Sequence, residues 1–234
     1  MTVQELRTKI EALSALRKQA ELVGHLAVHE TRVAETSARA RSVDQQYQAS
    51  LRVFEKVGAT SEVAGLSTVL ESRQNASRLA LKVAKRQSQD VAKIRTESTE
   101  RDLTNLHDAI RAAETRLRAK WKTYIDEFLN SYQQLAGALK QAHLVGAENI
   151  DRALTSLREV SGQPPGDDGQ ADRLAAEILK VRKGIEALGV DNVIGAFLVA
   201  AASGSADARQ LDLPQVRTFV DGAGLWQLLR VRLI

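Results

Sequence analysis

The stretch Val57-Gly58-Ala59-Thr60-Ser61-Glu62 decides the fold that this sequence predicts. Gly58 suits the left-handed residue that ends a helix, and Thr60 or Ser61 suits the N-cap of the next helix. A connection this short makes two long helices antiparallel neighbours. The stretch therefore predicts a helical hairpin whose tip lies near Gly58.

The residues on both sides of this turn favour unusually long helices. No proline precedes Pro164, and only five of the 14 glycines precede Ser161. Proline removes a helix hydrogen bond and glycine raises the entropic cost of helix formation, so their scarcity lets helices continue. We expect a first helix over about residues 3–57, about 80 Å long, and a second over about 61–143.

An apolar stripe marks one face of each helix. The polar segment 85–102 within the second helix is either a weakly packed coiled-coil segment or a local break. Pairing positions whose numbers sum to about 118 places Leu6 opposite Arg111 or Ala112. The first stripe consists of Leu6, Ile10, Leu13, Leu16, Ala20, Val23 and Ala27, and the second of Leu106, Ile110, Ala113, Leu117, Trp121, Tyr124, Phe128, Tyr132, Leu135 and Leu139.

The aromatic residues divide the chain into two parts. Only two of the nine precede Trp121, and the other seven lie between Trp121 and Trp226. Large rings supply much of the burial in a globular core. We therefore predict an all-α protein, in which a long antiparallel coiled-coil hairpin over residues 1–115 projects from a small helical head over residues 116–234.

The head is expected to contain several shorter helices and one loop. Asp191 and Asp212 suit N-caps, and Ser161–Gly169, which contains two prolines, suits a mobile loop. Four helices are expected, at about 147–160, 172–188, 192–202 and 213–221. The helix over 192–202 is apolar nearly all round, so we expect it at the centre of the head.

The segment Leu228–Ile234 differs from the rest because its apolar residues alternate with two arginines. Alternation of this kind predicts a short C-terminal β-strand. A strand needs a hydrogen-bonding partner, which is either a sheet edge in another protein or Gln210–Leu213 of the same chain. The residues expected to fill a partner's pockets are Leu229, Val231 and Leu233.

The end of the chain also resembles a group of known proteins. The resemblance is carried by Leu213-Pro214-Gln215-Val216-Arg217-Thr218-Phe219-Val220, Gly224-Leu225 and Leu229-Arg230-Val231-Arg232-Leu233. These motifs resemble the C-termini of uncharacterised bacterial coiled-coil proteins that are associated with large ATPases in phage-defence gene clusters. The resemblance covers about a tenth of the chain. It implies a multi-subunit, antiviral role and transfers no residue function.

Motifs for catalysis or metal binding are weak. The chain has no cysteine, which excludes disulfides, thiolate metal sites and a cysteine nucleophile. His25 and His29 stand at a spacing that can share a metal, but no third ligand is evident. Phosphate-loop, nucleophile-elbow and dinucleotide-turn motifs are missing. We expect no intrinsic enzyme activity, metal, cofactor or small-molecule substrate.

The hydropathy pattern predicts a cytoplasmic protein. The N-terminus has no apolar signal core, and the longest apolar stretch, Val193–Ala202, falls far short of the ~20 residues of a membrane span. Arginine outnumbers lysine and alanine is abundant, which favours a bacterial source.

Charge is distributed unevenly around a net value of +4. Residues 73–122 carry 13 basic and six acidic residues, whereas 146–221 carry eight basic and 12 acidic ones. Rows of cations on a helix can follow the phosphates of DNA or RNA, although a solvated face or an acidic protein partner is the more ordinary explanation. The main row is Arg78, Lys82, Lys85, Arg86 and Lys93, and a second is Arg111, Arg118 and Lys122.

The predicted function is a non-catalytic scaffold or adaptor subunit that binds other protein subunits or a second copy of itself. One alternative is a helical arm that contacts nucleic acid through the main basic row. Another is an accessory subunit that regulates a partner ATPase or nuclease.

Overall fold

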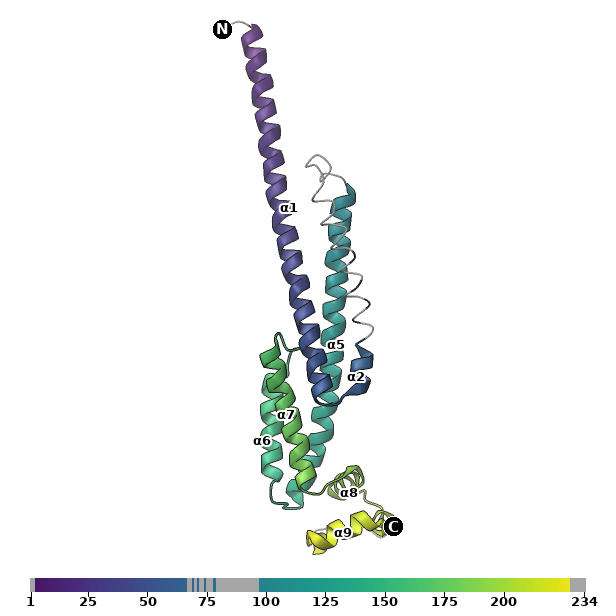
Figure 1. Ribbon diagram of the computed structural model, residues 1–234. Coiled ribbons are helices and arrows are strands. Elements are labelled where there is room, and N and C mark those ends of the chain that lie inside the picture. The colour runs from purple at the N-terminus through teal and green to yellow at the C-terminus, as the bar shows by residue number, and fades with distance from the viewer. Residues whose placement is uncertain are drawn as a thin grey trace. The chain divides into compact units, whose positions relative to one another are not determined.

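The computed structural model describes residues 3–66, 69, 71, 74, 78 and 97–227, with only the backbone described for 3–13, 18–27, 29–30 and 97–100. No strand occurs in this described part, which confirms the all-α prediction there. The predicted C-terminal strand lies outside it. The helices are α1 (Val3–Lys56), α2 (Thr60–Gly65), α5 (Glu97–Gln141), α6 (Ala147–Val160), α7 (Asp168–Ala187), α8 (Asn192–Ala202) and α9 (Pro214–Gly222), with 3₁₀ turns η1 (Ala208–Asp212) and η2 (Leu225–Gln227) (Figure 1).

The chain forms two compact units. The first consists of Met1–Asp44 and Glu71–Ala113, and the second of Gln45–Leu70 and Glu114–Ile234. Helices α1 and α5 each contribute to both units. The division expected from the sequence assigned residues 45–70 to the arm, whereas here they belong to the second unit.

In the first unit, α1 and α5 pack through a small apolar cluster. Val43 of α1 is buried together with Leu106, Ile110 and Ala113 of α5. Three partly buried residues flank this cluster, namely Val33, Ala40 and Ala109. The cluster contains no ring, so little apolar area holds this part of α1 to α5.

The residue numbers that meet show that α1 and α5 are parallel within each unit. In the first unit, residues 32–36 of α1 line a cavity with Leu103 of α5, and Val43 packs further along, in the cluster with Ile110. In the second unit, Phe54 stacks on Trp121, with ring centroids 5.8 Å apart. Numbers on the two helices therefore rise together (Figure 1).

This direction corrects the predicted pairing. An antiparallel hairpin with one helix over 61–143 requires low numbers on one helix to meet high numbers on the other. Helix α5 instead runs parallel to α1, so the predicted antiparallel pairing of these two helices is wrong. Most of the polar segment 85–102, where a local break was one of two predicted alternatives, lies outside the described residues.

The turn at Gly58 is as predicted. Gly58 has φ +68°, the left-handed conformation that glycine adopts without strain. Its N–H bonds to the Glu55 carbonyl, and the Ala59 N–H bonds to the Phe54 carbonyl at 2.8 Å, a Schellman motif. Neither Thr60 nor Ser61 caps the next helix, because Ala59 occupies the N-cap of α2.

A run of rings forms part of the core of the second unit. Phe54 meets Tyr124 edge-on with centroids 4.9 Å apart, and Phe128 lies 4.3 Å from Tyr132 on the same measure. Trp121 is only 1% exposed. The helices α6 and α7 pack against each other, and α9 packs against α8. Most of the rings that the sequence places after residue 120, Trp226 excepted, thus enter this core, and Phe54 of α1 joins them.

The shorter helices agree with the sequence in most places. Helices α6 and α8 have the expected bounds, α7 begins four residues earlier than expected, and Asp191 caps α8 by accepting a bond from the Ile194 N–H at 2.8 Å. The prediction of Asp212 as an N-cap is wrong, because Leu213 holds that position and Pro214 begins α9.

One of the two partners considered for the C-terminal strand, Gln210–Leu213, is not a strand. These residues belong largely to η1, where the Asp207 side chain accepts hydrogen bonds from backbone N–H groups and the Gln210 side chain accepts one from the Asp207 N–H. This capping box satisfies the start of the turn locally. These residues therefore offer no strand edge.

The double-proline loop is anchored to the core, although the sequence suggested a mobile loop. Trp121 donates its indole N–H to the Ser161 carbonyl at 2.8 Å, and Ser161 is 3% exposed. Pro164 and Pro165 are buried as well. The loop therefore positions the start of α7 against the core.

Within the described ranges, no single helix combines the length and the apolar character needed to span a membrane. Only α7 and α8 taken together meet that test, and an 85° bend separates them.

Candidate functional site

The main basic row is mostly beyond what the structure describes. Arg78 is helical and exposed, as expected for a cation on a solvated face. The other four members, Lys82, Lys85, Arg86 and Lys93, lie outside the described residues. Contact with nucleic acid through this row stays a prediction.

The second basic row is partly neutralised by neighbouring acids. Arg118 pairs with Glu114 at 2.7 Å, and Lys122 pairs with Asp126. Both pairs join residues four apart on α5, so they neutralise charge on the helix surface itself. This row offers a phosphate backbone less positive charge than the sequence suggested.

The remaining predicted sites gain no structural support. The tail residues Leu229, Val231 and Leu233 lie outside the described range, as do the side chains of His25 and His29. Across the part of the chain that is described, no three His, Cys, Asp or Glu side chains gather as metal ligands.

A cavity of about 720 Å³ lies at the start of α6, lined by Lys140, His143 and Arg152 among others. Two of its cations are engaged: Lys140 pairs with Asp151 at 2.5 Å, and Arg152 bonds to Asn149 at 2.8 Å. The cavity therefore carries less free positive charge than its residue types suggest.

A more distinctive feature is the exposed side of α8. The sequence, apolar nearly all round, predicted a helix buried at the centre of the head. Ile194, Phe197 and Leu198 are buried as expected, but Ala196 is exposed and Val199 is only half-buried. Part of this apolar helix therefore faces outward.

This outward side forms one wall of an open groove of about 770 Å³ between α5, α7 and α8. Leu135, Ile185, Val190 and Val199 supply an apolar floor. Polar groups surround the floor, namely Ser131, Tyr132, Gln134, Arg182, Glu186, Asp191 and Asn192. A mostly apolar cavity with a few polar groups at its rim is the usual form of a binding site.

The one arginine that lines this groove is already engaged. Its guanidinium donates a hydrogen bond to the Val57 carbonyl at the end of α1 and lies 5.8 Å from the centroid of the Phe128 ring. Glu186 is exposed, and among the described residues no hydrogen bond or ion pair to its carboxylate is found. The rim carries two carboxylates, those of Glu186 and Asp191, against the single charge of Arg182, so its formal charge is negative.

Tyr124 of α5 belongs to the run of rings in the core and is 8% exposed. Burial raises the pKa of its hydroxyl, an effect that the positive charge of Arg182 partly offsets. Its oxygen has no hydrogen-bond partner among the described residues. A neutral, buried phenol of this kind contributes to packing rather than to acid–base chemistry.

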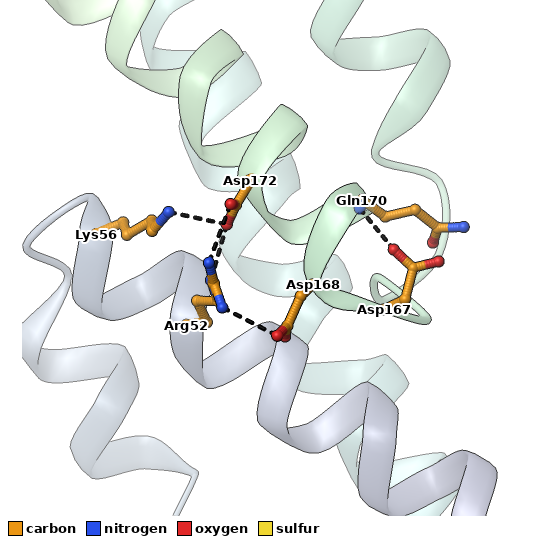
Figure 2. A network of polar contacts seen from close by, with 6 residues as sticks. All are labelled: Arg52, Lys56, Asp167, Asp168, Gln170 and Asp172. Atoms are coloured by element: carbon orange, nitrogen blue, oxygen red, sulfur yellow. Dashed lines mark hydrogen bonds and ion pairs between the residues drawn. The ribbon is translucent and has the colours of Figure 1, made fainter.

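A polar network joins the end of α1 to the start of α7 within the second unit. Figure 2 shows Arg52 reaching two carboxylates: it pairs with Asp172 at 2.7 Å and Asp168 at 3.0 Å, and Lys56 adds a 2.8 Å contact to Asp172. The neighbouring Asp167 caps α7 by accepting from the Gln170 N–H.

The network perturbs the groups that form it. Hydrogen bonds from Lys56 and Arg52 lower the pKa of Asp172 below its ordinary value near 3.8. The hydrogen bond with Asp172 likewise raises the pKa of Arg52. Because these side chains are 40–45% exposed, solvent screens the attraction, and the network positions α7 more than it stabilises the fold.

Comparisons of the chain with protein-family models, curated proteins and solved structures gave no match.

Sequence reasoning missed the groove and the network because both join distant parts of the chain. Arg52 and Asp172 are 120 residues apart, and neither has a local signal that names the other. The sequence held one signal of the groove, which is the apolar character of α8 on every side. This pattern predicts a buried helix, but a helix with one exposed apolar side has the same pattern.

Proposed function

We propose that this chain is a non-catalytic coiled-coil scaffold subunit that associates with a second copy of itself through the N-terminal half of α1. The observation that carries the proposal is the exposure of a large apolar residue of the predicted stripe there. Leu16 is 60% exposed on a helix of 54 residues. Long helices in proteins draw most of their stability from a packed apolar face, so this face needs a partner.

The exposed stripe is distinct from the seam that α5 covers. Leu16 and Val43 are 27 residues apart, which is seven and a half helical turns, so they point to opposite sides of α1. Because α5 packs on the side of Val43, it does not cover Leu16.

The spacing of the stripe favours a coiled-coil partner. From Leu6 to Ala27 the sequence takes six apolar steps over 21 residues, or 3.5 residues per step, which is the heptad period. A second copy necessarily carries the same period, and a two-fold dimer contact uses one patch twice. The resemblance of the tail to proteins of phage-defence clusters adds support for a multi-subunit setting.

Sedimentation equilibrium of the full chain tests this proposal. We expect a dimer at micromolar concentration and a shift to monomer, by at least tenfold in the dissociation constant, for Leu16→Glu. Ser14→Glu is the matched control, because it adds the same charge at an exposed position of the same helix, on the side away from Leu16. A wild-type monomer at 100 µM, or equal dimerisation of both variants, would refute the proposal.

A further inference from the structure

The groove between α5, α7 and α8 leaves part of an apolar helix open to water. One wall is the outward side of α8, where Ala196 is exposed and Val199 is half-buried. Leaving apolar area in water costs about 25 cal/mol per Å², so a segment that covers it gains stability. Such a segment must begin close to the groove, be long enough to reach it and carry a charge that complements its rim.

The end of the described chain lies close to this groove. Leu225 is 2% exposed and shares a small cavity with Ala138 of α5 and Leu198 of α8. Ala138 follows Leu135, which lines the groove, by three residues, or about 4.5 Å along the axis of α5. The chain therefore leaves Gln227 within a short distance of the groove.

The remaining length is sufficient to reach it. Seven residues follow Gln227, and in an extended conformation they span about 24 Å. Passing around half the circumference of α8, whose diameter is about 10 Å, takes about 16 Å of it, so the last two or three residues remain to lie in the groove.

The chemistry of this tail complements the groove. Its alternating pattern presents apolar residues on one side for the floor and Arg230 and Arg232 on the other. The rim offers Glu186 and Asp191, while its own arginine is held by the Val57 carbonyl. The side-chain amides of Gln134 and Asn192 also line the groove, and amides can bond to an extended backbone.

We propose that the end of the C-terminal segment Leu228–Ile234 docks in the α5–α7–α8 groove of its own chain, with Leu233 on the floor and Arg232 at the acidic rim. This goes beyond the scaffold function, since it concerns the second unit alone. It also replaces the strand pairing with Gln210–Leu213, which η1 rules out.

Disulfide trapping tests the proposal directly, because the full chain has no cysteine of its own. The test variant pairs Ala196→Cys in the groove wall with Ile234→Cys, which leaves the apolar and basic tail residues unchanged. The matched control pairs Ile234→Cys with Gln215→Cys, an exposed position on α9. We expect the groove pair to form an intramolecular disulfide at least tenfold faster, read by intact mass under non-reducing conditions.

Charge reversal provides a second measurement. Glu186→Arg in the groove-pair background should slow disulfide formation at least threefold, whereas Glu159→Arg, the same change at an exposed position of α6 outside the groove, should not. Equal rates for the two cysteine pairs, disulfides that join only separate chains, or insensitivity to Glu186→Arg would each overturn the proposal. Because the dimer contact is tested on α1, these results are independent of those for Leu16→Glu.

Discussion

The two units of this protein use the same pair of helices and pack them differently. In the first unit, α1 and α5 meet through Val43 and a few small or branched side chains. In the second, they meet through Phe54 and Trp121, and further helices cover the contact. Buried rings contribute far more apolar area than valine or alanine does, so stability concentrates in the second unit.

The same helix thus has a different environment along its length. Between Gln45 and Lys56, α1 belongs to a core and is tied to α7 by Arg52. Before Val33 it carries exposed apolar residues, which suits association rather than folding. A helix that is held firmly at one end can present the other end to a partner.

The largest expected effect comes from Trp121→Ala. The change removes the stacking on Phe54 and leaves the Ser161 carbonyl without its indole donor. We expect a loss of about 4 kcal/mol in the free energy of unfolding, measured by urea denaturation. The control is Trp226→Ala, which removes a ring that is 46% exposed and should cost about 1 kcal/mol or less. Equal losses would contradict a ring-centred core.

A smaller effect is expected from Val43→Ala in the first unit. Removing two buried methyl groups should cost about 2 kcal/mol and loosen residues 33–44 of α1. Hydrogen exchange with mass spectrometry measures this loss of protection. The matched change is Val53→Ala, a fully buried valine ten residues along the same helix, which should loosen the second unit instead. If both variants loosened both units equally, the two units would unfold as one.

The sequence predicted local features well because their causes are local. The turn at Gly58 needs only a residue that adopts positive φ, and the cap of α8 needs only Asp191 before an apolar run. The gathering of rings after residue 120 was also visible, since aromatic content is a matter of composition.

The direction of α5 was not predictable in the same way. Periodicity says which face of a helix is apolar, but it does not name the partner that covers the face. Leu106, Ile110 and Ala113 therefore suit an antiparallel or a parallel neighbour equally well.

The smallest expected effect tests the polar network that fixes α7 to α1. In the native chain the pKa of Asp172 lies below its ordinary value near 3.8, because Lys56 and Arg52 bond to the charged form. The unfolded chain therefore binds a proton more readily, so the network stabilises the fold above about pH 4 and loses this effect as pH falls through the native pKa. Asp172→Asn removes the titrating group.

We expect the melting temperature of the variant to be slightly lower than that of the wild type at pH 7, and the two melting temperatures to become equal by pH 2. The difference at pH 7 should shrink in 1 M NaCl, where the Debye length is about 3 Å. Identical melting curves at every pH would mean that the contacts in Figure 2 position α7 without stabilising it.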